Sequence, residues 1–463
     1  MNEWLHNRLQ GKSLILLGFG REGQATYRLI RKILPGSRIA IADRNEDIRE
    51  HPMTAEDELI DYYTGTEYLK SIYRYDLIIR SPGIPIWNLD PQPERERITS
   101  QTDLFLQYFA SQVTGITGTK GKSTTTSLIH HILQTAGMDS VLLGNIGNPA
   151  FHFTEIIRHE TRIIFELSSH QLEYISRSPH IAILLNLFPE HLDACAGFME
   201  YQKAKINITL FQQHGDFLIW HSDDPLITER LEEIPLLAHS YPFSLNRSLQ
   251  QGCFVRGDEV LFSDGCLTKT IWRIHQDRFL RGEHNLKNIL AAVTASILLK
   301  VDTEAIGEGI STFKGLEHRL EYVGEFRGIH FYNDSISTIP EACIEAVRSI
   351  PGVDTLIAGG FDRGIPYDSL AAFLLDSQVR TLVFIGAAGR RIGEAMEAIQ
   401  QKRGRNDHTQ KIFYINRFDD LREIVFRETR KDHACLLSPA AASYDEFNNF
   451  EERGKRFRLL VQK

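Results

Sequence analysis

A glycine-rich segment that follows a short apolar run constrains this chain more than any other feature. Residues 113–117 are apolar or small, and residues 118–124 then read Gly-Thr-Lys-Gly-Lys-Ser-Thr. Small residues at Gly118 and Gly121 let backbone N–H groups approach phosphate oxygens, Lys122 supplies a positive charge, and the Ser123 hydroxyl can hold Mg²⁺. Ile116 stands where the longer form of this loop has its first glycine, so the match is to the shorter form. The pattern predicts a strand, a phosphate-binding loop and a helix, and hence nucleoside triphosphate chemistry.

Size and composition indicate a soluble protein of several domains. The chain has 463 residues, which suggests three domains at roughly 100 to 200 residues each. A net charge of -8 argues against a nucleic-acid or membrane-surface binder, and no apolar run reaches the roughly 18 residues of a membrane span. The five cysteines are scattered and never spaced as CxxC, so neither a disulfide framework nor a zinc site is indicated and a cytoplasmic protein is expected.

The first hundred residues are typical of a parallel α/β unit. Short apolar runs at 14–17, 38–42 and 77–79 alternate with helix-like stretches. The first run leads into Gly-Phe-Gly-Arg-Glu-Gly at 18–23, and the second is followed by Asp43. A GxGxxG turn in this context suggests NAD about as often as another diphosphate ligand, so the motif alone names no cofactor.

The second unit places polar residues where predicted strands end. Strands are expected at 162–166 and 181–186, the first ending in Glu166 and the second in Asn186. Glu190, His191 and Asp193 follow the second strand. Because the carboxyl ends of parallel strands meet at one edge, these side chains and the phosphate loop predict a metal–phosphate site. Residues 215–280 alternate and are rich in turn formers, which suggests an antiparallel appendage.

A third α/β unit begins near residue 316. Strands are expected at 329–332, 355–358, 381–385, 411–415 and 434–437, and turn-rich segments follow several of them. The predicted domains are therefore 1–108, 109–315 and 316–463, with hinges near 108 and 315. The cleft between the second and third domains is the predicted active site.

Several segments together resemble those of the Mur ligases, over essentially the whole chain. The segments that carry the resemblance are Gly-Thr-Lys-Gly-Lys-Ser-Thr at 118–124, Glu-Leu-Ser-Ser-His-Gln-Leu at 166–172, His-Leu-Asp at 191–193, Tyr-Gln-Lys-Ala-Lys at 201–205, His-Asn-Leu-Lys-Asn at 284–288, Glu-His-Arg at 317–319 and Asn-Asp-Ser at 333–335. Residues 437–450 are most similar to the glutamate-adding branch of that family.

The resemblance implies both a fold and a reaction. It implies three α/β domains: a Rossmann-like domain that binds a UDP substrate, a central P-loop ATPase-like parallel sheet, and a C-terminal doubly wound Rossmann-like sheet that binds glutamate. The reaction would be ATP-driven amide formation, in which the alanyl carboxylate of UDP-N-acetylmuramoyl-L-alanine becomes an acyl phosphate and glutamate's amine displaces phosphate. No protein nucleophile is needed, because the enzyme mainly positions reactants and neutralises phosphate charge.

The resemblance assigns the catalytic and metal residues. Two Mg²⁺ ions are expected, and Lys205 would be carbamylated, which converts a cation that Mg²⁺ would repel into an anionic oxygen ligand. The expected catalytic residues are Lys122, Glu166, His191 and Lys205, and the expected metal ligands are Ser123, Glu166, His191 and Lys205.

It also assigns ligand contacts in the first two domains and at the start of the third. For Asn285 and Asn288 the alternative is helix capping. Expected ATP contacts are Gly118, Thr119, Lys120, Gly121, Lys122, Ser123, Thr124, Asn285, Asn288, Arg319 and Asp334. Expected contacts to the UDP substrate are Gly20, Arg21, Gly23, Asp43, Arg44, Ser81, Gly83, Asn145, Ser168, Gln171 and His191.

The glutamate site departs from the family pattern. Ile336 stands where family members commonly carry lysine, and Arg363 stands where others have lysine. L-glutamate is therefore kept as an alternative to the usual D-glutamate. The expected glutamate contacts are Thr338, Arg363, Ser443 and Phe450.

Two other functions remain as alternatives. A folylpolyglutamate synthase would share the phosphate loop and the carbamylated lysine but has no N-terminal UDP-binding domain. A non-catalytic nucleotide sensor would need ATP contacts but no second metal site. The enzyme is expected to be a monomer.

Overall fold

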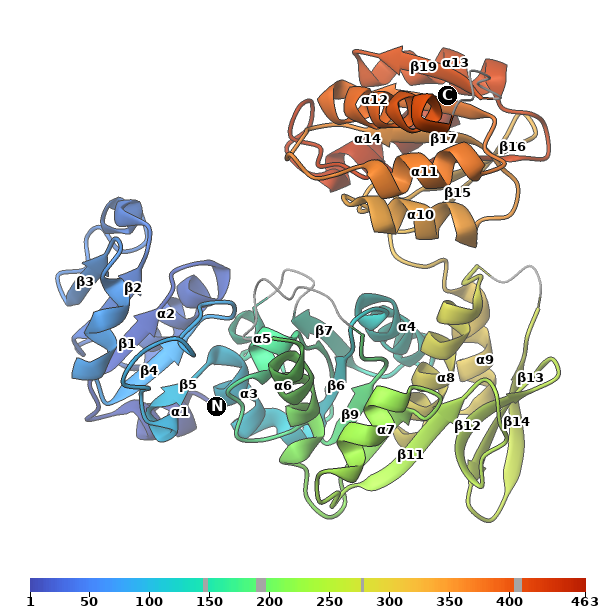
Figure 1. Cartoon of the computed structure of the whole chain (residues 1–463). Helices are drawn as coiled ribbons and strands as arrows, with labels where there is room; N and C mark the ends of the chain where they lie inside the picture. Colours follow the sequence, from blue (N-terminus) through green and yellow to red (C-terminus); the bar gives the residue numbers. More distant parts are fainter. Residues whose placement is uncertain (145–148, 189–196, 276–278, 404–409) are drawn as a thin grey trace. The chain divides into compact units, whose positions relative to one another are not determined.

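The computed structural model describes residues 1–144, 149–188, 197–275, 279–403 and 410–463, which form three β-sheets with flanking helices (Figure 1). Two predicted site residues, Asn145 and His191, lie outside these ranges. Contacts divide the chain into two compact units, one of residues 1–275 and 283–311 and the other of residues 276–282 and 312–463. In the described ranges no helix is both long and apolar enough to cross a membrane.

The first sheet is parallel and has the strand order β3-β2-β1-β4-β5. Strand residues alternate between its two faces, so Leu14 and Leu16 join one apolar cluster and Ile15 and Leu17 another. Its elements are α1 (Asn2–Leu9), β1 (Leu14–Leu17), α2 (Arg21–Ile33), β2 (Ile39–Asp43), β3 (Ile60–Thr64), β4 (Leu77–Arg80), β5 (Ile98–Thr99) and α3 (Gln101–Phe109), with short 3₁₀ turns at Glu46–Glu50, Tyr68–Arg74 and Arg95–Arg97.

The central sheet has the order β14-β13-β12-β11-β10-β9-β6-β8-β7. Helices α4 and α8 pack side by side against it (Figure 1). Its strands are β6 (Val113–Thr117), β7 (Ser140–Gly144), β8 (Arg162–Glu166), β9 (Ile181–Leu184), β10 (Phe217–His221), β11 (His239–Ser244), β12 (Gln251–Arg256), β13 (Glu259–Asp264) and β14 (Thr268–Arg273). Its helices are α4 (Lys122–Thr135), α5 (Ser169–Leu172), α6 (Phe198–Leu210), α7 (Pro225–Glu232), α8 (Glu283–Leu298) and α9 (Thr303–Thr312), with 3₁₀ turns at Ala110–Gln112 and Ala150–Phe153.

The predicted antiparallel appendage at 215–280 is only partly correct. Strands β10 and β11 pair in parallel and extend the central sheet, and β12 joins β11 in parallel. Only β12, β13 and β14 pair antiparallel, at the outer edge of the same sheet (Figure 1). The segment is thus the end of a mixed sheet rather than a separate appendage.

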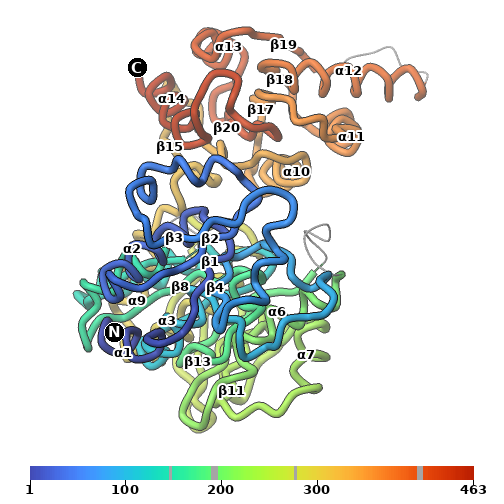
Figure 2. The backbone as a smooth tube through the Cα atoms, turned by 90° about the vertical axis from the view of Figure 1, so that its left-hand side faces the viewer, coloured from blue at the N-terminus to red at the C-terminus, as the bar shows by residue number. Residues whose placement is uncertain are grey.

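The C-terminal sheet has the order β15-β16-β20-β17-β18-β19, in which only β15 is antiparallel to its neighbour. Helices α10, α11 and α12 cover one face and α13 and α14 the other, so two apolar clusters sandwich the strands (Figure 2). The elements are β15 (Glu321–Phe326), β16 (Ile329–Asn333), α10 (Pro340–Ser349), β17 (Val353–Gly359), α11 (Asp368–Asp376), β18 (Thr381–Ile385), α12 (Gly386–Arg403), β19 (Lys411–Ile415), α13 (Leu421–Glu428), β20 (Ala434–Leu437) and α14 (Phe450–Gln462), with a 3₁₀ turn at Phe418–Asp420.

The first two sheets share close contacts. Arg80 at the end of β4 forms an ion pair of 2.8 Å with Glu173, which follows α5. The Tyr174 ring lies under two guanidinium groups, 4.9 Å from that of Arg80 and 5.4 Å from that of Arg95. These contacts join residues on both sides of position 108 within the first compact unit.

Candidate functional site

The phosphate loop runs from β6 into α4 in the conformation that its glycines require. Gly118 has φ 154° and Gly121, which precedes the first residue of α4, has φ 86°. Both values disfavour a residue with a side chain. Asn186, just after β9, holds the loop from the neighbouring strand: its Oδ1 accepts from Lys120 N at 2.8 Å and its Nδ2 donates to Lys120 O at 3.0 Å. The conformation of the loop is therefore fixed by its glycines and by two hydrogen bonds to the Asn186 amide.

Two lysines converge on this loop. Lys122 Nζ donates to Gly118 O at 2.9 Å and to Thr119 O at 3.0 Å. Lys205, buried on α6, donates to the same Gly118 O at 2.8 Å, and its Nζ lies 4.7 Å from the centre of the Tyr201 ring. Two ammonium groups that share one carbonyl repel each other, and burial strengthens that repulsion.

The expected metal ligands come from adjacent elements. Glu166 ends β8 and is buried, and in the parallel pairing with β6 it stands opposite Ile116, two residues before the loop. Ser123 lies in the first turn of α4. A carboxylate and a hydroxyl fit a hard cation such as Mg²⁺, whereas an unmodified ammonium at Lys205 does not. No group of three or more Asp, Glu, His or Cys side chains able to hold a metal occurs in the described ranges, from which His191 is missing.

The predicted adenine contacts on α8 reach the phosphate loop. A Cβ atom added to Gly121 would lie 2.4 Å from Asn288 Oδ1. Asn288 Nδ2 donates to Asn285 Oδ1 at 3.3 Å, one helical turn away. Both residues lie inside α8, so the alternative that they cap the helix is wrong.

The GxGxxG loop of the first sheet lies beside the loop after β4. Ser81 Oγ donates to Gly18 O at 3.1 Å, which brings the predicted contacts at Ser81 and Gly83 next to the turn. Gly23 allows the helix to pack closely, because an added Cβ would lie 2.1 Å from Gly18 O. Asp43 accepts from Phe19 N at 2.7 Å and from Asn45 N at 2.8 Å, so its carboxylate stabilises this turn. Gly20, Arg21 and Arg44 are exposed beside it.

Ser168 and Gln171 form a capping box at the start of α5. Gln171 N donates to Ser168 Oγ at 3.3 Å, and Ser168 N donates to Gln171 Oε1 at 3.0 Å. The same glutamine donates through Nε2 to Glu22 Oε1 at 2.9 Å. Sequence reasoning did not single out Glu22, although it lies inside the GxGxxG motif.

In the C-terminal unit, Asp334 follows β16 and is buried. Its Oδ1 accepts from Leu320 N at 3.1 Å and its Oδ2 from Ser438 Oγ at 2.8 Å. Burial raises the pKa of Asp334 to about 6, against the opposing effects of Ser337, Ser438, Leu320 and Arg319. Arg319 therefore lies near enough to act on this carboxyl electrostatically, so the two predicted ATP contacts of this unit are neighbours.

A residue that the sequence did not single out, Arg453 on α14, connects loops of the predicted glutamate site. Its guanidinium donates to Ser335 Oγ and O at 3.0 and 2.9 Å, to Ala441 O at 3.0 Å and to Ala442 O at 3.1 Å. Burial lowers the pKa of Arg453 to about 10. Its place one helical turn after Phe450 is the only signal that could have indicated it.

The four predicted glutamate contacts come from segments that meet at this edge. Arg363 Nη2 donates to Thr338 O at 2.7 Å, so these two predicted contacts are adjacent. Ser443 is buried and follows Ala441 and Ala442, whose carbonyls accept from Arg453. Phe450 O accepts from Ser335 Oγ at 2.8 Å. Thr338 and Arg363 are thus linked directly, and a β-bridge between Phe361 and Ala442 brings the segments of Arg363 and Ser443 together.

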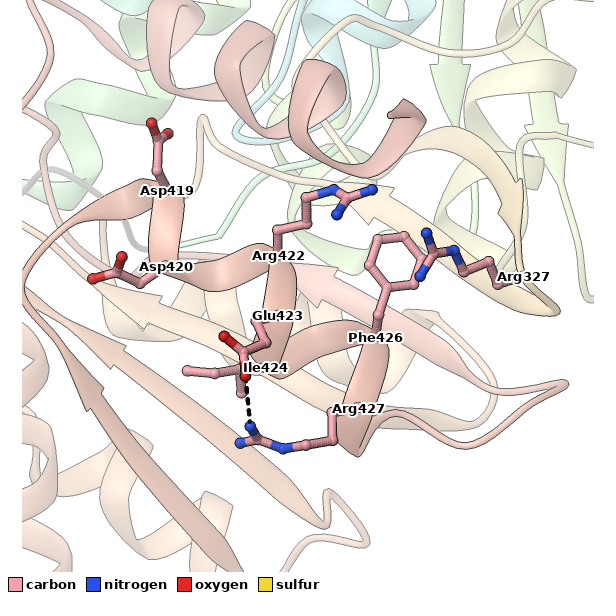
Figure 3. A pocket seen from close by; sticks show the side chains of 8 residues that line it. All are labelled: Arg327, Asp419, Asp420, Arg422, Glu423, Ile424, Phe426 and Arg427. Carbon is pink, nitrogen blue, oxygen red and sulfur yellow. Dashed lines mark hydrogen bonds and ion pairs between the residues drawn. The ribbon is translucent and has the colours of Figure 1, made fainter.

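Of two hollows among the described residues, one contains no predicted site residue and the other contains one. One of about 770 Å³ is formed around α13, where Arg327 and Arg422 flank the Phe426 ring (Figure 3). Another of about 240 Å³ lies among the loop after β4, α5 and α6, and includes Gly83. The first contains none of the predicted site residues.

Comparison with known proteins adds sequence relatives over the full length. Residues 116–296 match the family model of the Mur ligase middle domain. A protein of Koribacter versatilis named UDP-N-acetylmuramoylalanine--D-glutamate ligase is 33% identical over 463 residues, covering 98% of both chains. The protein of the same name from Symbiobacterium thermophilum is 35% identical over 463 residues, with the same coverage.

Solved structures show a similar fold. The chain is similar to MurF from Acinetobacter baumannii with a TM-score of 0.59 and 17% identity, over 98% of this chain and 92% of that one. It is similar to the UDP-N-acetylmuramate-alanine ligase MurC from Thermotoga maritima with a TM-score of 0.55 and 15% identity, over 97% and 99%. At such identities the likeness concerns the fold alone.

Proposed function

Because this chain belongs to the Mur ligase family, we propose that it is the ATP-dependent ligase that joins D-glutamate to UDP-N-acetylmuramoyl-L-alanine, in the cytoplasmic synthesis of peptidoglycan precursors. The observation that carries the proposal is the full-length similarity to relatives that bear this enzyme's name, at 33% and 35% identity. The intact phosphate loop, Glu166 and buried Lys205 support a catalyst rather than a nucleotide sensor.

The side chains near the phosphate loop suit activation of a carboxylate. A carboxylate is a poor electrophile, and transfer of the γ-phosphoryl group of ATP turns one of its oxygens into a leaving group. Loop N–H groups and Lys122 would hold the phosphates and neutralise the charge that develops on them. Ser123 and Glu166 would hold Mg²⁺, which supplies further neutralisation of phosphate charge when bound.

Carbamylation of Lys205 is part of the proposal. The shared acceptor at Gly118 O brings together two ammonium groups, of which that of Lys205 is buried. Loss of a proton from Lys205 and addition of its free amine to CO₂, with release of a second proton, would give a carbamate. This would remove one positive charge and add anionic oxygens suited to a second Mg²⁺. The modification therefore relieves the repulsion between Lys122 and Lys205 and completes a ligand set.

We expect the Lys205→Ala variant to lose activity, since it lacks the carbamate. A short carboxylate such as formate or acetate should partly restore turnover by occupying the space of the carbamate. Phosphate release with and without the additive measures this, and Lys203→Ala, which lies on the same helix but is exposed, is the matched control. Full activity of Lys205→Ala without additive would remove this lysine from the mechanism.

Handedness of the amino acid depends on the contacts around Arg363. Arg363 supplies a cation beside Thr338 where Ile336 supplies none, so it would bind one carboxylate of glutamate while Ser443 and Phe450 contact the other end. A cation at one end and a hydroxyl at the other suit a dicarboxylate amino acid. The D-enantiomer is preferred because the relatives named above carry it in their names.

The function is tested by phosphate release from ATP with UDP-N-acetylmuramoyl-L-alanine and Mg²⁺, with D-glutamate and L-glutamate compared in parallel. Mass spectrometry of the product confirms that glutamate has been added. Turnover with D-glutamate alone supports the proposal, turnover with L-glutamate alone reassigns the amino acid, and no turnover with either contradicts it.

A further inference from the structure

Glu22 occupies an unusual place for a carboxylate. It lies in the first turn of α2, between Arg21 and Gly23, where the GxGxxG turn is predicted to receive a diphosphate. Its Oε1 accepts from Gln171 Nε2 at 2.9 Å, while its buried Oε2 has no hydrogen-bond partner among the described residues. A carboxylate that turns one oxygen toward another element and leaves the other buried without a donor costs free energy, which suggests a use.

Two hydrogen bonds, one from Ser168 and one to Glu22, hold the Gln171 amide in a single orientation. Gln171 Oε1 accepts from Ser168 N at 3.0 Å, and a backbone N–H can only donate, so this end of the amide must be oxygen. Its Nε2 must then face Glu22, where the carboxylate accepts. Glu22 thereby accepts one of the two N–H groups of Nε2 and holds the side chain of a predicted substrate contact in place.

The groups around Glu22 leave its charge weakly compensated. Gln171 from α5 contacts its carboxylate, and Gln101 from α3 donates to its backbone carbonyl at 3.0 Å. Arg21 on the same turn is exposed, and Arg80 of β4 is paired with Glu173. Burial accordingly raises the pKa of Glu22 to about 7, against a smaller lowering by Gln171.

We propose that Glu22 is a positioning residue for the sugar-nucleotide substrate, which orients the Gln171 amide and, through its own charge, sets how well the start of α2 accepts the substrate's diphosphate. This inference rests on the proposed function. When Glu22 carries a proton, the helix N-terminus and Arg21 attract the diphosphate unopposed. When Glu22 is ionised, its negative charge in the same turn opposes the phosphates.

The test compares Glu22→Gln and Glu22→Leu with the wild-type enzyme between pH 6 and pH 8.5. The KM for UDP-N-acetylmuramoyl-L-alanine is measured in turnover and the Kd of UDP by calorimetry, so that binding is read with and without catalysis. For the wild type, both constants should rise about three- to tenfold as pH increases through 7, because Glu22 ionises.

The two variants separate charge from orientation. Glu22→Gln keeps an acceptor for Gln171 but carries no charge, so its KM and UDP Kd should stay low and nearly independent of pH. Glu22→Leu removes the acceptor and should raise the KM for the sugar nucleotide about tenfold at all pH values, with little change in kcat or in the KM for ATP. Glu56→Gln, at an exposed glutamate in the segment before β3, controls for loss of a charge.

Three outcomes would overturn this inference: a wild-type UDP Kd independent of pH, a Glu22→Gln variant with the wild-type pH dependence, or a Glu22→Leu variant whose only change is a lower melting temperature. Failure of the wild type both to turn over the sugar nucleotide and to bind UDP would contradict the proposed function itself. A wild type that turns over while the Glu22 variants match it would contradict only the role of Glu22.

Discussion

Asp334, a predicted ATP contact, shows how burial of a single residue makes the stability of the fold depend on pH. Its folded-state pKa of about 6 lies above the ordinary value of 3.8, so the folded protein binds more protons than the unfolded chain between these values. Stability from this group is therefore present below about pH 4 and is lost as pH rises toward 6. The loss is on the order of 3 kcal/mol from a shift of about two units.

The Asp334→Asn variant should lack this pH dependence. Asn Oδ1 can still accept from Leu320 N, and its Nδ2 can donate to Ser438 Oγ, because a hydroxyl can also accept. Urea unfolding at pH 4.5 and pH 7 measures the difference, which should be smaller in the variant than in the wild type. Equal differences in the two proteins would show that Asp334 is not the titrating group.

The sequence indicated the chemistry of the candidate site better than it indicated which side chains contact one another. The pattern around Lys122 and Glu166 predicted a phosphate loop and a carboxylate at a strand end, and the structure places both at neighbouring parallel strands. Glu22 and Arg453 could not be recognised, because their importance comes from partners 149 and 118 positions away in the chain. Such pairings are set by tertiary packing, which a local pattern does not contain.

At the scale of elements, the approach of α8 to the phosphate loop predicts a strong effect of Gly121→Ala. An added Cβ would meet Asn288 Oδ1 at 2.4 Å, and the positive φ adds strain of about 1 kcal/mol or more. We expect ATP binding to weaken at least tenfold, measured by calorimetry. Gly137→Ala, just after the other end of α4, has φ 69° and no neighbour within 4 Å, so it isolates the strain of the backbone alone. Equal losses in both variants would contradict a role for the α8 contact.

Helix α14 predicts a second effect, through Arg453. Lysine cannot reproduce four bonds made by a planar guanidinium, so Arg453→Lys should loosen the 441–443 loop that carries Ser443. The KM for glutamate should rise about tenfold while the KM for ATP changes little. Arg456→Lys on the same helix, whose partner is Asp419 at the surface, is the matched control. An unchanged KM for glutamate would argue against this link.

Apolar strands were predicted well where both faces are buried. The runs at 14–17, 113–117, 162–166, 381–385 and 434–437 match β1, β6, β8, β18 and β20. The run at 411–415 matches β19, an edge strand that is only partly buried. Strand β3 was missed, because Ile-Asp-Tyr-Tyr-Thr is only partly buried and reads as polar. The parallel pairing of β10 with β11 was missed, because the sequence of one strand does not show whether its neighbour runs parallel or antiparallel to it.

For the whole molecule, the predicted ligand contacts fall on both compact units, so we expect ligands to change the distance between them. An acyl phosphate must be protected from water, which favours closure. Energy transfer between labels on Glu232→Cys and Glu397→Cys, in a background with Cys195→Ser and Cys266→Ser, reports on the two units. This distance should change when a non-hydrolysable ATP analogue and the sugar nucleotide are added.

A second label pair tests whether residues 1–275 and 283–311 move as one body. The contacts of Arg80 and Arg95 with Glu173 and Tyr174 join the first sheet to the central one. The distance between labels on Lys12→Cys and Glu232→Cys should therefore stay constant under the same additions. A change in the distance between these two labels would support the hinge predicted near residue 108.

The assignment of residues 279–282 has a consequence for protein engineering. This short segment belongs with the C-terminal unit although the chain then returns to the other unit until residue 311. Leu280 is buried and its Cδ2 lies 3.8 Å from the Cβ position of Gly315, and the charge of Arg281 acts on Tyr322 and Tyr332. The C-terminal unit is thus not continuous in sequence. A chimera that exchanges only the residues after 311 would pair each half with a foreign segment, so a graft between relatives must carry both pieces.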